Sequence, residues 1–501
     1  MTVIARVGAV ISRVSRARSA KQLSLMMVIT MVTQVVSIYK SSVIAANFGA
    51  STELDAFNFG SNIASFFCII VSSGIITVLI PAYVNKAKRS SVDTVITFLF
   101  LVTGLFLLLT FILRGQIVDL ITDREDQFKN YVGSTLLFSI LIQMLPAALS
   151  VTTTYYQSQD RFNLPKIILM VSNLGVAAVL SIWKDFSIHG YLHILLGGAI
   201  LQFAVDTACA LFYGFRFRLT FDFRDKQFLE MLRMLLPAVF GTAIYSLNTT
   251  IKALISSNLG TGQLTVLSFA NMMNIMINTM VIGNLSAYVF PRFVKKLGIG
   301  QPQAQRALWG SVTVFHAVVG LLVAGFLNIG REFIGLLYEH GRFTSGAADS
   351  IFYCMCLFLV GQQANIIRDL IYRYFSADGD TKSTMKNGIN TCVLGVSLSL
   401  ILSYWWGIYG IVAGTVISNF YSAAEIFLRF RRKYGLAIAI RPYLGELVKT
   451  EASLLMTAGV VFLFKKLYTP PSTLLSLLIF GTITVLLFLL NMRLFKMKLF
   501  Y

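Results

Sequence analysis

Residues 38–49 read IYKSSVIAANFG, and residues 250–260 read TIKALISSNLG. The alignment places Lys40 opposite Lys252, and the Asn-Phe-Gly ending of the first stretch opposite the Asn-Leu-Gly ending of the second. Each stretch ends a long apolar segment just before a short loop. A match of this kind between the two halves of a chain is typical of membrane transporters built from an internal repeat.

Further matches follow along the chain in the same order, at offsets between 211 and 222 residues. Each pairs a polar or aromatic residue of the first half with a similar residue of the second half. They are Asn58 and Asn62 with Asn271 and Asn274, YYQSQD at 155–160 with YFSADGD at 374–380, and LSIW at 180–183 with LSYW at 402–405. This repeat predicts two lobes of six helices with the same orientation, related by an axis along the membrane normal.

The composition is that of a membrane protein. Apolar residues make up 56% of the 501 residues, and charged residues make up 13%, about half of the ~25% that is usual in soluble proteins. The charge is strongly basic, with 42 Lys and Arg against 22 Asp and Glu. The basic residues lie in short clusters between apolar segments, so they indicate loops at an anionic membrane surface and argue against a nucleic-acid partner.

About fourteen apolar segments are long enough to cross the hydrocarbon core, which takes roughly 20 helical residues. They lie at 22–47, 56–83, 92–113, 131–157, 164–183, 190–214, 231–256, 263–291, 308–328, 347–375, 385–405, 408–429, 446–464 and 473–492. With the N-terminus inside, the cytoplasmic loops carry about 30 Lys and Arg and the external loops about eight. This bias predicts a multi-pass protein of a bacterial inner membrane with both termini in the cytoplasm.

These patterns predict an all-α polytopic membrane protein in four parts. Residues 1–20 are expected to form a basic amphipathic segment, 21–220 the first lobe, 221–435 the second lobe and 436–501 an extra helix pair. Two such lobes are expected to enclose a central cavity and to expose it to either side by rocking, which is the architecture of a transporter.

Three stretches carry a resemblance to a known family. They are FGASTELDAFNFG at 48–60, REFIGLLYEHGRFTSGAADS at 331–350 and, one helix later, YRYFSADGDTKSTMK at 372–386. These stretches resemble the MurJ (MviN) family of lipid II flippases. That family belongs to the MOP superfamily, with the MATE antiporters and the Wzx-type polysaccharide flippases. The resemblance implies two six-helix lobes and an extra helix pair that holds a polyprenyl tail.

The chain departs from that family in its cavity. MurJ proteins line the cavity with arginines, and the corresponding positions here are Gln34 and Lys40 in the first predicted helix and Met272 in the eighth. The paired arginines of the second helix fall near Phe66 to Cys68. The implied cavity is less cationic than a MurJ cavity. Both lipid II and an exopolysaccharide or O-antigen repeat unit therefore stay open as the cargo.

A lipid-linked glycan carries a diphosphate, so its carrier needs a positive group inside the membrane. Lys40 and Lys252 are the candidates, because a charge near mid-membrane costs at least about 2.5–3.5 kcal/mol and so tends to face an interior cavity. Their positions in the repeat predict one lysine on each side of the central axis. The alternative is that each side chain reaches out to the external interface, about two turns away.

Amide side chains are the candidates for binding sugars. Gln34 lies in the first predicted helix, Asn58 and Asn62 in the second, and Asn271 and Asn274 in the eighth. They are predicted to line the polar cavity. Hydrogen bonding between helices is the alternative.

Four ionisable residues are candidates for coupling or gating. Asp55 opens the second predicted helix, where capping by an N-terminal carboxylate is the alternative role. Asp206, Arg368 and Asp369 lie deeper, where a carboxylate could exchange a proton or bind Na⁺, or belong to a structural ion pair. Because adjacent residues on a helix do not face each other, Arg368 and Asp369 are expected to have different partners.

Together these residues predict a flippase that moves an undecaprenyl-pyrophosphate-linked glycan from the cytoplasmic to the outer leaflet by alternating access. The alternative is a MATE-like, cation-coupled antiporter of small molecules, which would need an acidic cavity. The sequence has no GxxxxGK[ST] loop, so the driving force is expected from a Na⁺ or H⁺ gradient or from the membrane potential rather than from ATP.

No catalytic or metal site is expected. The four histidines and five cysteines show neither an HExxH nor a CxxC spacing, so we expect neither enzyme activity nor a bound cofactor. The expected partners are the lipid-linked glycan, membrane lipids and proteins of cell-envelope glycan synthesis. The chain itself is expected to act as a monomer.

Overall fold

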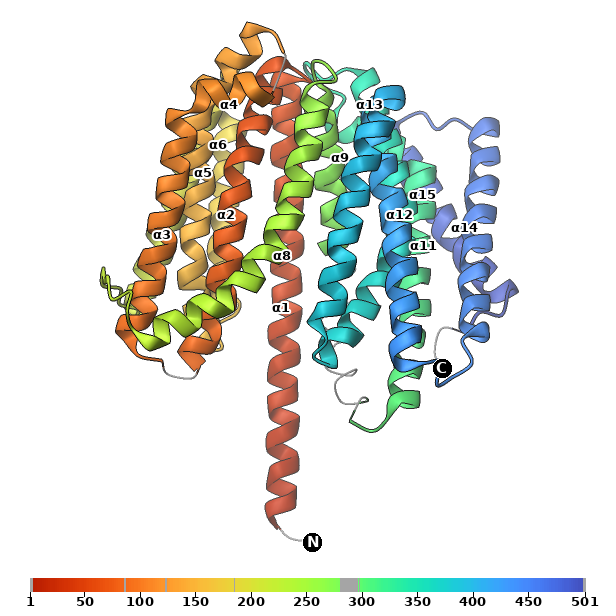
Figure 1. The fold of residues 1–501 in the computed structure, drawn as a ribbon. Helices are drawn as coiled ribbons and strands as arrows, with labels where there is room; N and C mark the ends of the chain where they lie inside the picture. Colours follow the sequence, from red (N-terminus) through yellow and green to blue (C-terminus); the bar gives the residue numbers. More distant parts are fainter. Residues whose placement is uncertain are drawn as a thin grey trace. The chain divides into compact units, whose positions relative to one another are not determined.

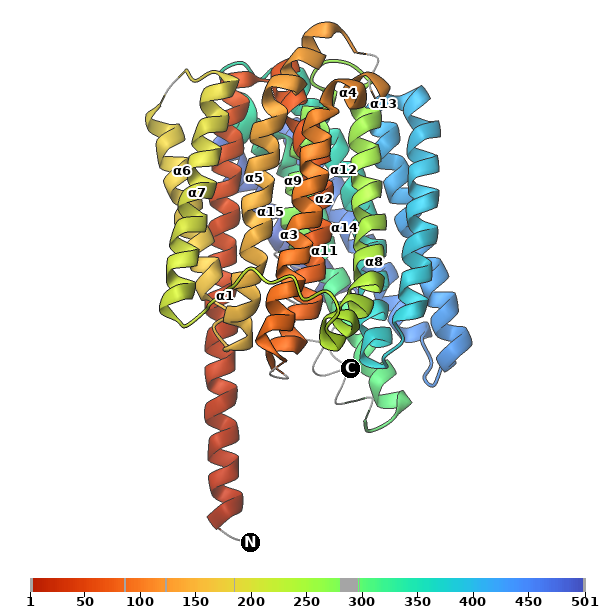
Figure 2. The same cartoon turned by 60° about the vertical axis from the view of Figure 1, so that its left-hand side comes forward.

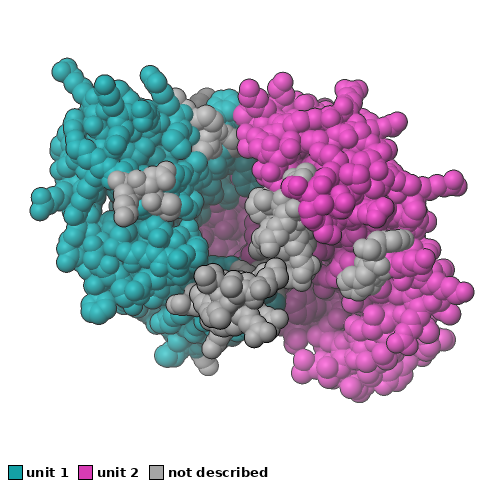
Figure 3. Space-filling view, turned by 90° about the horizontal axis from the view of Figure 1, so that it is seen from below, with its two compact units in different colours: residues 1–43, 59–246 teal, residues 44–58, 247–501 magenta. Residues whose placement is uncertain are grey.

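The computed structural model describes residues 3–84, 87–121, 124–183, 185–279, 296 and 298–498. Every regular element in this part of the chain is a helix. The chain divides into two compact units. Unit 1 comprises residues 1–43 and 59–246, and unit 2 comprises residues 44–58 and 247–501 (Figure 3).

Unit 1 is a bundle of long apolar helices. Its elements are α1 (Val3–Phe48), α2 (Thr52–Val84), α3 (Arg89–Ile112), α4 (Arg114–Ile121), α5 (Asp126–Ser158), α6 (Leu164–Ile182), α7 (Ile188–Phe212) and the first part of α8 (Lys226–Ser257) (Figure 1). The end of α1 and the beginning of α2, at residues 44–58, belong to unit 2.

Apolar side chains at helical spacing hold unit 1 together. Ile75 and Leu79 of α2 are fully buried and share a cluster with Ile96 of α3 and Leu235 of α8. The spacing of four residues places Ile75 and Leu79 on one face of their helix. In a bilayer such contacts stabilise the bundle by van der Waals packing, because lipid tails are as apolar as the side chains.

Unit 2 is built around α11. Its elements are the second part of α8, α9 (Gln263–Ile277), α11 (Gln301–Tyr338), α12 (Ser345–Ala377), α13 (Thr381–Tyr434), α14 (Arg441–Leu467) and α15 (Thr473–Leu494). Helix α11 packs against α12, α14 and α15, and α12 also packs against α9 and α13 (Figures 1 and 2).

Helix α13 consists of two antiparallel arms joined at Gly407. This glycine has φ 55° and ψ −133°, a backbone conformation that is strained for residues with a side chain. The arms then lie side by side, and the Ser399 hydroxyl donates a hydrogen bond to the Ile411 carbonyl at 3.1 Å. The two arms are the predicted spans at 385–405 and 408–429.

The predicted fold class is confirmed. In the described part of the chain, 11 helices are long and apolar enough to cross a membrane, and α13 is one of them although it holds two predicted spans. The remaining predicted spans coincide with α8 and α9. The eighth predicted span runs over 263–291, and its part at 280–291 lies outside the described residues.

The predicted N-terminal segment, residues 1–20, is helical from Val3 and continuous with the first span (Figure 1). Its place at a membrane surface stays a prediction. The same holds for the predicted boundaries of the lobes and the extra pair, at 21–220, 221–435 and 436–501.

Candidate functional site

Asp55 of α2 forms hydrogen bonds with the beginning of α9, and both lie in unit 2. Its side chain is fully buried, and its two carboxylate oxygens accept hydrogen bonds from two residues near the beginning of α9. The donors are the Gly262 amide at 2.6 Å, the Thr265 amide at 2.8 Å and the Thr265 hydroxyl at 2.7 Å. The first amides of a helix lack intrahelical partners and carry partial positive charge. Asp55 therefore caps α9, and both the capping of its own helix and a gating role stay predictions.

Three chain segments interlock around this cap. The Arg342 amide donates to the Ala46 carbonyl at 2.8 Å, and the Asn58 amide group donates to the Thr265 hydroxyl at 3.4 Å. Gly341 has φ +63°, and a Cβ there would lie 2.2 Å from the Ala46 oxygen, so this position requires glycine. A Cβ on Gly49 would likewise lie 2.5 Å from the Arg342 oxygen, so the stretches at 48–60 and 331–350, which carry the family resemblance, are in contact.

Lys40 is half-buried near the end of α1 and has a neutral partner in unit 1. Its ammonium donates a hydrogen bond to the side-chain oxygen of Asn173 on α6. One residue earlier, the hydroxyl of Tyr39 is hydrogen-bonded to Ser181 at 2.7 Å. These two contacts tie α1 to α6. Gln34, between one and two turns earlier on α1, has no hydrogen-bond partner within the described residues.

Lys252, the repeat counterpart of Lys40, lies on α8 in unit 2 and points toward α13. Its Nζ atom is 3.7 Å from the position that a Cβ on Gly395 would occupy, and it interacts electrostatically with the Cys392 thiol. Ser418, on the other arm of α13, also borders Gly395. No hydrogen bond or ion pair from Lys252 occurs in the part of the chain that the structure describes. An ammonium without a partner in an apolar span is a strong attractor for an anion.

The two candidate amides of α9 differ in their hydrogen bonding within the described chain. Asn274 accepts a hydrogen bond from the amide group of Gln362 on α12, and Asn365 donates to the Gln362 oxygen at 3.4 Å. Asn271, one turn earlier on α9, has no hydrogen bond among the described residues. Gln362 was not among the predicted site residues. The signal was the run QQAN at 362–365 within an apolar span.

Asp206 is buried between α7 and α5 in unit 1, with 2% of its surface exposed. Its carboxylate lies beside the Thr152 hydroxyl, and Oδ2 has no hydrogen-bond partner in the described chain. The backbone carbonyl of Asp206 accepts a hydrogen bond from Tyr156 at 2.8 Å. An open carboxylate oxygen in an apolar environment is suited to bind a proton or a cation. Asn62 of α2, also in unit 1, is half-buried.

Arg368 and Asp369 pair with each other, so the expectation of different partners is wrong. The Nε atom of Arg368 lies 2.9 Å from the Asp369 carboxylate, and Nη1 donates to Asn419 of α13 at 3.3 Å. Adjacent Cβ atoms do diverge on a helix. The long arginine side chain nevertheless folds back far enough to reach its neighbour. The pair neutralises itself and links α12 to α13.

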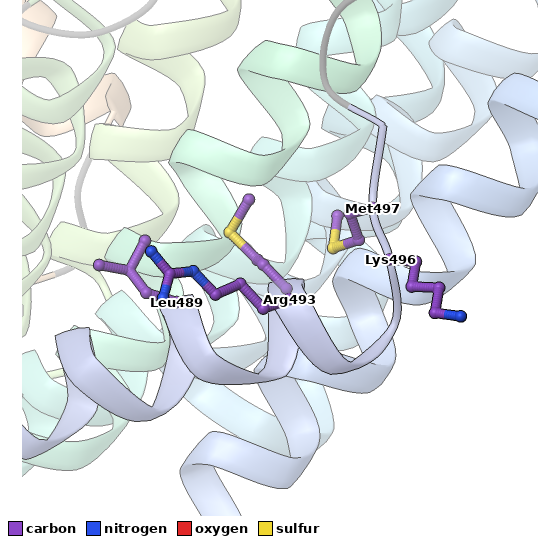
Figure 4. A pocket seen from close by; sticks show the side chains of 5 residues that line it. Leu489, Arg493, Lys496 and Met497 are labelled. Atoms are coloured by element: carbon purple, nitrogen blue, oxygen red, sulfur yellow. The ribbon is translucent and has the colours of Figure 1, made fainter.

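An open pocket lies at the end of α15 in unit 2. Its lining residues are Leu489, Met492, Arg493, Lys496 and Met497 (Figure 4). The predicted site residues do not line it. Arg493 and Lys496 point in different directions, so these two cations do not converge on one ligand (Figure 4).

Sequence comparisons link most of the chain to one family. The family model described as "Lipid II flippase MurJ" matches residues 44–482. A relative from Borreliella burgdorferi, named "Probable lipid II flippase MurJ", is 23% identical over 457 residues, which cover 88% of this chain and 89% of the relative. A Synechocystis relative of the same name is 22% identical and covers 82% of this chain and 81% of its own length.

Solved structures share the fold. A lipid II flippase MurJ in an inward closed conformation matches with a TM-score of 0.80 at 16% identity, over 94% of this chain and 98% of that chain. An inward-facing MATE-family multidrug transporter matches with a TM-score of 0.67 at 13% identity, over 81% and 98%. Identities this low show the fold alone, whereas the family model spans most of the sequence. The chain belongs to the MurJ family of lipid II flippases.

Proposed function

We propose that this chain moves lipid II from the cytoplasmic to the outer leaflet of a bacterial inner membrane by alternating access. Membership of the MurJ family and the names of the two relatives support lipid II as the cargo. The chemistry of the candidate site supports an anionic cargo. A small-cation antiporter would need carboxylates where this repeat supplies Lys40 and Lys252.

Lys252 is the observation that carries this proposal. Its ammonium has no carboxylate or hydrogen-bonding partner among the described residues, although it lies on an apolar helix. A diphosphate oxygen would satisfy it through a charge-assisted hydrogen bond. Gly395 has no side chain, and the position that its Cβ would occupy lies 3.7 Å from Nζ and 2.9 Å from the Ser418 hydroxyl, so small groups of α13 face the ammonium. Lysine also acts as a point charge, which accepts an anion from several directions.

The candidate asparagine side chains have different roles in this proposal. Asn271 is half-buried and has no partner in the described chain, so it is available to donate to and accept from a sugar hydroxyl. Asn274 is already held by Gln362, so it serves mainly to position α9 against α12. Asn58 likewise supports the cap of α9 through Thr265.

We assign the coupling ion to Asp206 within the same proposal. Its open oxygen would take up H⁺ or Na⁺ and release it during the transport cycle. The membrane potential contributes about 2.3 kcal/mol per charge per 100 mV, which favours outward movement of an anionic cargo. Membrane lipids and proteins of cell-envelope glycan synthesis are the proposed partners of a monomeric carrier.

Complementation tests the proposal. The full chain is expressed in cells depleted of their lipid II flippase and, in parallel, in cells that lack a polysaccharide flippase. Restored growth of the first strain, without restored polysaccharide export in the second, is the expected result. Rescue of the second strain alone would assign the cargo to a polysaccharide repeat unit. Rescue of neither, together with gained resistance to cationic drugs, would overturn the proposal in favour of an antiporter.

A further inference from the structure

Residues 215–224 form a strap between α7 and α8 in unit 1. They read FRFRLTFDFR, so apolar residues occupy every second position from 215 to 223. The strap has no regular secondary structure from 215 to 222, and Figure 2 shows it as an extended trace that crosses α5 and α3 in that view. It therefore intersperses bulky apolar side chains with arginines along an extended backbone.

Contacts with α3 and α5 hold the strap against unit 1. The hydroxyl groups of Thr220 and of Thr94 on α3 are hydrogen-bonded at 3.1 Å. The Phe215 ring packs edge-on against Tyr155 of α5, with the ring centroids 5.3 Å apart. Thr94 lies in the second turn of α3, and Tyr155 lies in the last turn of α5. The strap therefore lies at the end of these spans, where they reach the membrane surface.

The middle of the strap leaves its apolar side chains uncovered. Leu219 is 66% exposed and Phe221 is 55% exposed, and Phe217 is exposed as well. Phe212, at the end of α7, is exposed on the span that leads into the strap. Aromatic side chains at the ends of spans are typical of the membrane interface, where their rings contact the acyl chains. The strap therefore extends the lipid-facing surface of α7 into that interface.

The backbone of the strap belongs to the layer of lipid headgroups. The amides of Arg216, Phe217, Leu219 and Phe221 have no hydrogen-bond partner within the described residues. An unpaired amide among acyl chains is costly, so a backbone of this kind does not lie in the hydrocarbon core. Water and phosphate oxygens in the headgroup layer satisfy such amides. The strap thus lies at the depth of the lipid phosphates, with its exposed apolar side chains within reach of the acyl chains.

The strap carries more positive than negative charge, with three arginines against one aspartate. Arg224 is exposed and forms no ion pair in the part of the chain that the structure describes. Its neighbour Asp225 lies 3.9 Å from the ammonium of Lys88. Arg218 is exposed as well, and the Asp93 carboxylate that attracts it is buried and already accepts the Arg218 backbone amide. The two guanidinium groups are therefore available to an anion from outside the protein.

We propose that the strap is a binding site for an anionic phospholipid, such as phosphatidylglycerol, of the leaflet at this end of unit 1. Arg218 and Arg224 bind the headgroup phosphate through charge-assisted hydrogen bonds, and the unpaired amides between them bind its oxygens. The exposed apolar side chains contact the acyl chains. A zwitterionic headgroup binds less well, because its own cation is repelled by the two arginines. The inference does not depend on which cargo the chain carries.

A built site of this kind differs from the general attraction of a basic loop to an acidic membrane. The basic end of α13 also carries two exposed arginines, Arg431 and Arg432. They lie in the last turn of a helix, where the backbone amides are paired within the helix. The next residue, Lys433, is bound by Asp380 at 2.7 Å. This end of α13 attracts anionic lipid but offers no unpaired amides to a phosphate, so it is the matched control.

Fluorescence quenching of the full chain in nanodiscs tests the proposal. Phe221→Trp places a reporter in the strap, and the signal of the four native tryptophans is subtracted by measuring the chain without this substitution. The bilayer is an equal mixture of phosphatidylcholine and phosphatidylglycerol, and one of the two is brominated in its acyl chains. Quenching by brominated phosphatidylglycerol should exceed quenching by brominated phosphatidylcholine. The ratio of the two should fall about 5-fold for each arginine replaced in Arg218→Gln with Arg224→Gln.

Two further variants separate a site from diffuse attraction. Arg431→Gln with Arg432→Gln removes the same charge from the end of α13 and should leave the quenching ratio unchanged. Arg218→Lys with Arg224→Lys keeps the charge of the strap and should retain most of the preference for phosphatidylglycerol. An equal fall of the ratio in the α13 variant would reduce the strap to one basic loop among several and would overturn the proposal.

The reporter itself supplies the remaining outcomes. Equal quenching by the two lipids would show that the strap has no preference for an anionic headgroup. Absence of quenching by either lipid would place the strap in water. Loss of the preference on addition of a little undecaprenyl phosphate would assign the strap to a polyprenyl phosphate instead. Each of these three results would overturn the proposal.

Discussion

The regions around Lys40 and Lys252 begin from the same sequence pattern and end in different environments. Lys40 donates to Asn173 of α6, so its charge is solvated by an amide within unit 1. Lys252 points to Gly395 of α13 within unit 2 and has no hydrogen-bonding partner among the described residues. The repeat therefore conserves the position of the lysine in its helix but not the group that it meets.

This difference shows that matching positions in an internal repeat can meet different neighbours. The helix that carries each lysine is fixed by apolar periodicity, which both halves share. The partner is supplied by another helix, where a single residue decides whether the ammonium is satisfied. Asn173 satisfies one lysine, and glycine at position 395 leaves the other available. On the proposed function, Lys252 is therefore expected to be the stronger anion site, and Lys40 is expected to contribute more to stability.

The largest effect is expected from Lys252→Met. The substitution removes the charge and keeps the length of the side chain, so a charge-assisted contact worth about 1.5–3 kcal/mol is lost. Flipping of fluorescent lipid II in proteoliposomes should fall about 10- to 100-fold, and Lys252→Arg should retain part of the activity. Unchanged flipping in Lys252→Met, with Lys40→Met inactive, would reverse the comparison between the two regions.

Asn173→Leu should leave the ammonium of Lys40 without its hydrogen-bond acceptor, which is the situation of Lys252 in the described chain. The substitution leaves a half-buried ammonium without its acceptor and should destabilise the protein by about 1–3 kcal/mol in thermal unfolding. Removing both partners, in Asn173→Leu with Lys40→Met, should restore most of the stability because no polar group is then left unsatisfied. A double variant as unstable as the single one would mean that Asn173 acts through another contact.

The sequence predicted the helices well because their signal is local. Apolar length and loop charge placed the spans, including the two arms of α13, without knowledge of any contact. Gly407 sits in the short break between the predicted spans 385–405 and 408–429, and it forms the turn.

The residues that contact the predicted site residues could not be predicted from the same local signals. Asn173 and Gln362 are single polar residues in apolar helices, and nothing in their spacing says which distant helix they meet. Asp55 was predicted either to gate or to cap its own helix. The Gly262 amide that it binds, at the beginning of α9, lies 207 residues further along the chain. The prediction that Arg368 and Asp369 have different partners was wrong for another reason. The directions of adjacent Cβ atoms do not limit where a long arginine side chain can reach.

Asp55→Asn tests a second asymmetry between the halves. The register that aligns Asn58 with Asn271 places Ser268 opposite Asp55, so only the first half supplies this carboxylate. The amide of asparagine offers one acceptor oxygen where two oxygens receive hydrogen bonds, and it lacks the charge that the start of α9 attracts. We expect a loss of about 1–2 kcal/mol in thermal unfolding. Ser268→Ala, its register counterpart, should have a smaller effect.

The smallest effect is expected from a lysine whose partners are carboxylates at the end of a helix. Lys433 donates to Asp380 at 2.7 Å, and this contact, with hydrogen bonds from Ser383, lowers the pKa of Asp380 to about 2. A lowered carboxyl pKa stabilises the fold above the ordinary value of 3.8, and the gain is lost as the pH falls through about 2.

Asp380→Asn should therefore lower stability by the same small amount, under about 1 kcal/mol after screening by solvent, at every pH from 5 to 8. Thermal unfolding at three pH values measures this, with Lys433→Met as the matched variant from the other side of the pair. A penalty that varies over this range would mean that a different group titrates. A stability penalty as large as that of Asn173→Leu would show that a lysine paired at the surface contributes as much stability as one held inside an apolar span. Lys40 and Lys252 could then not be ranked by their surroundings.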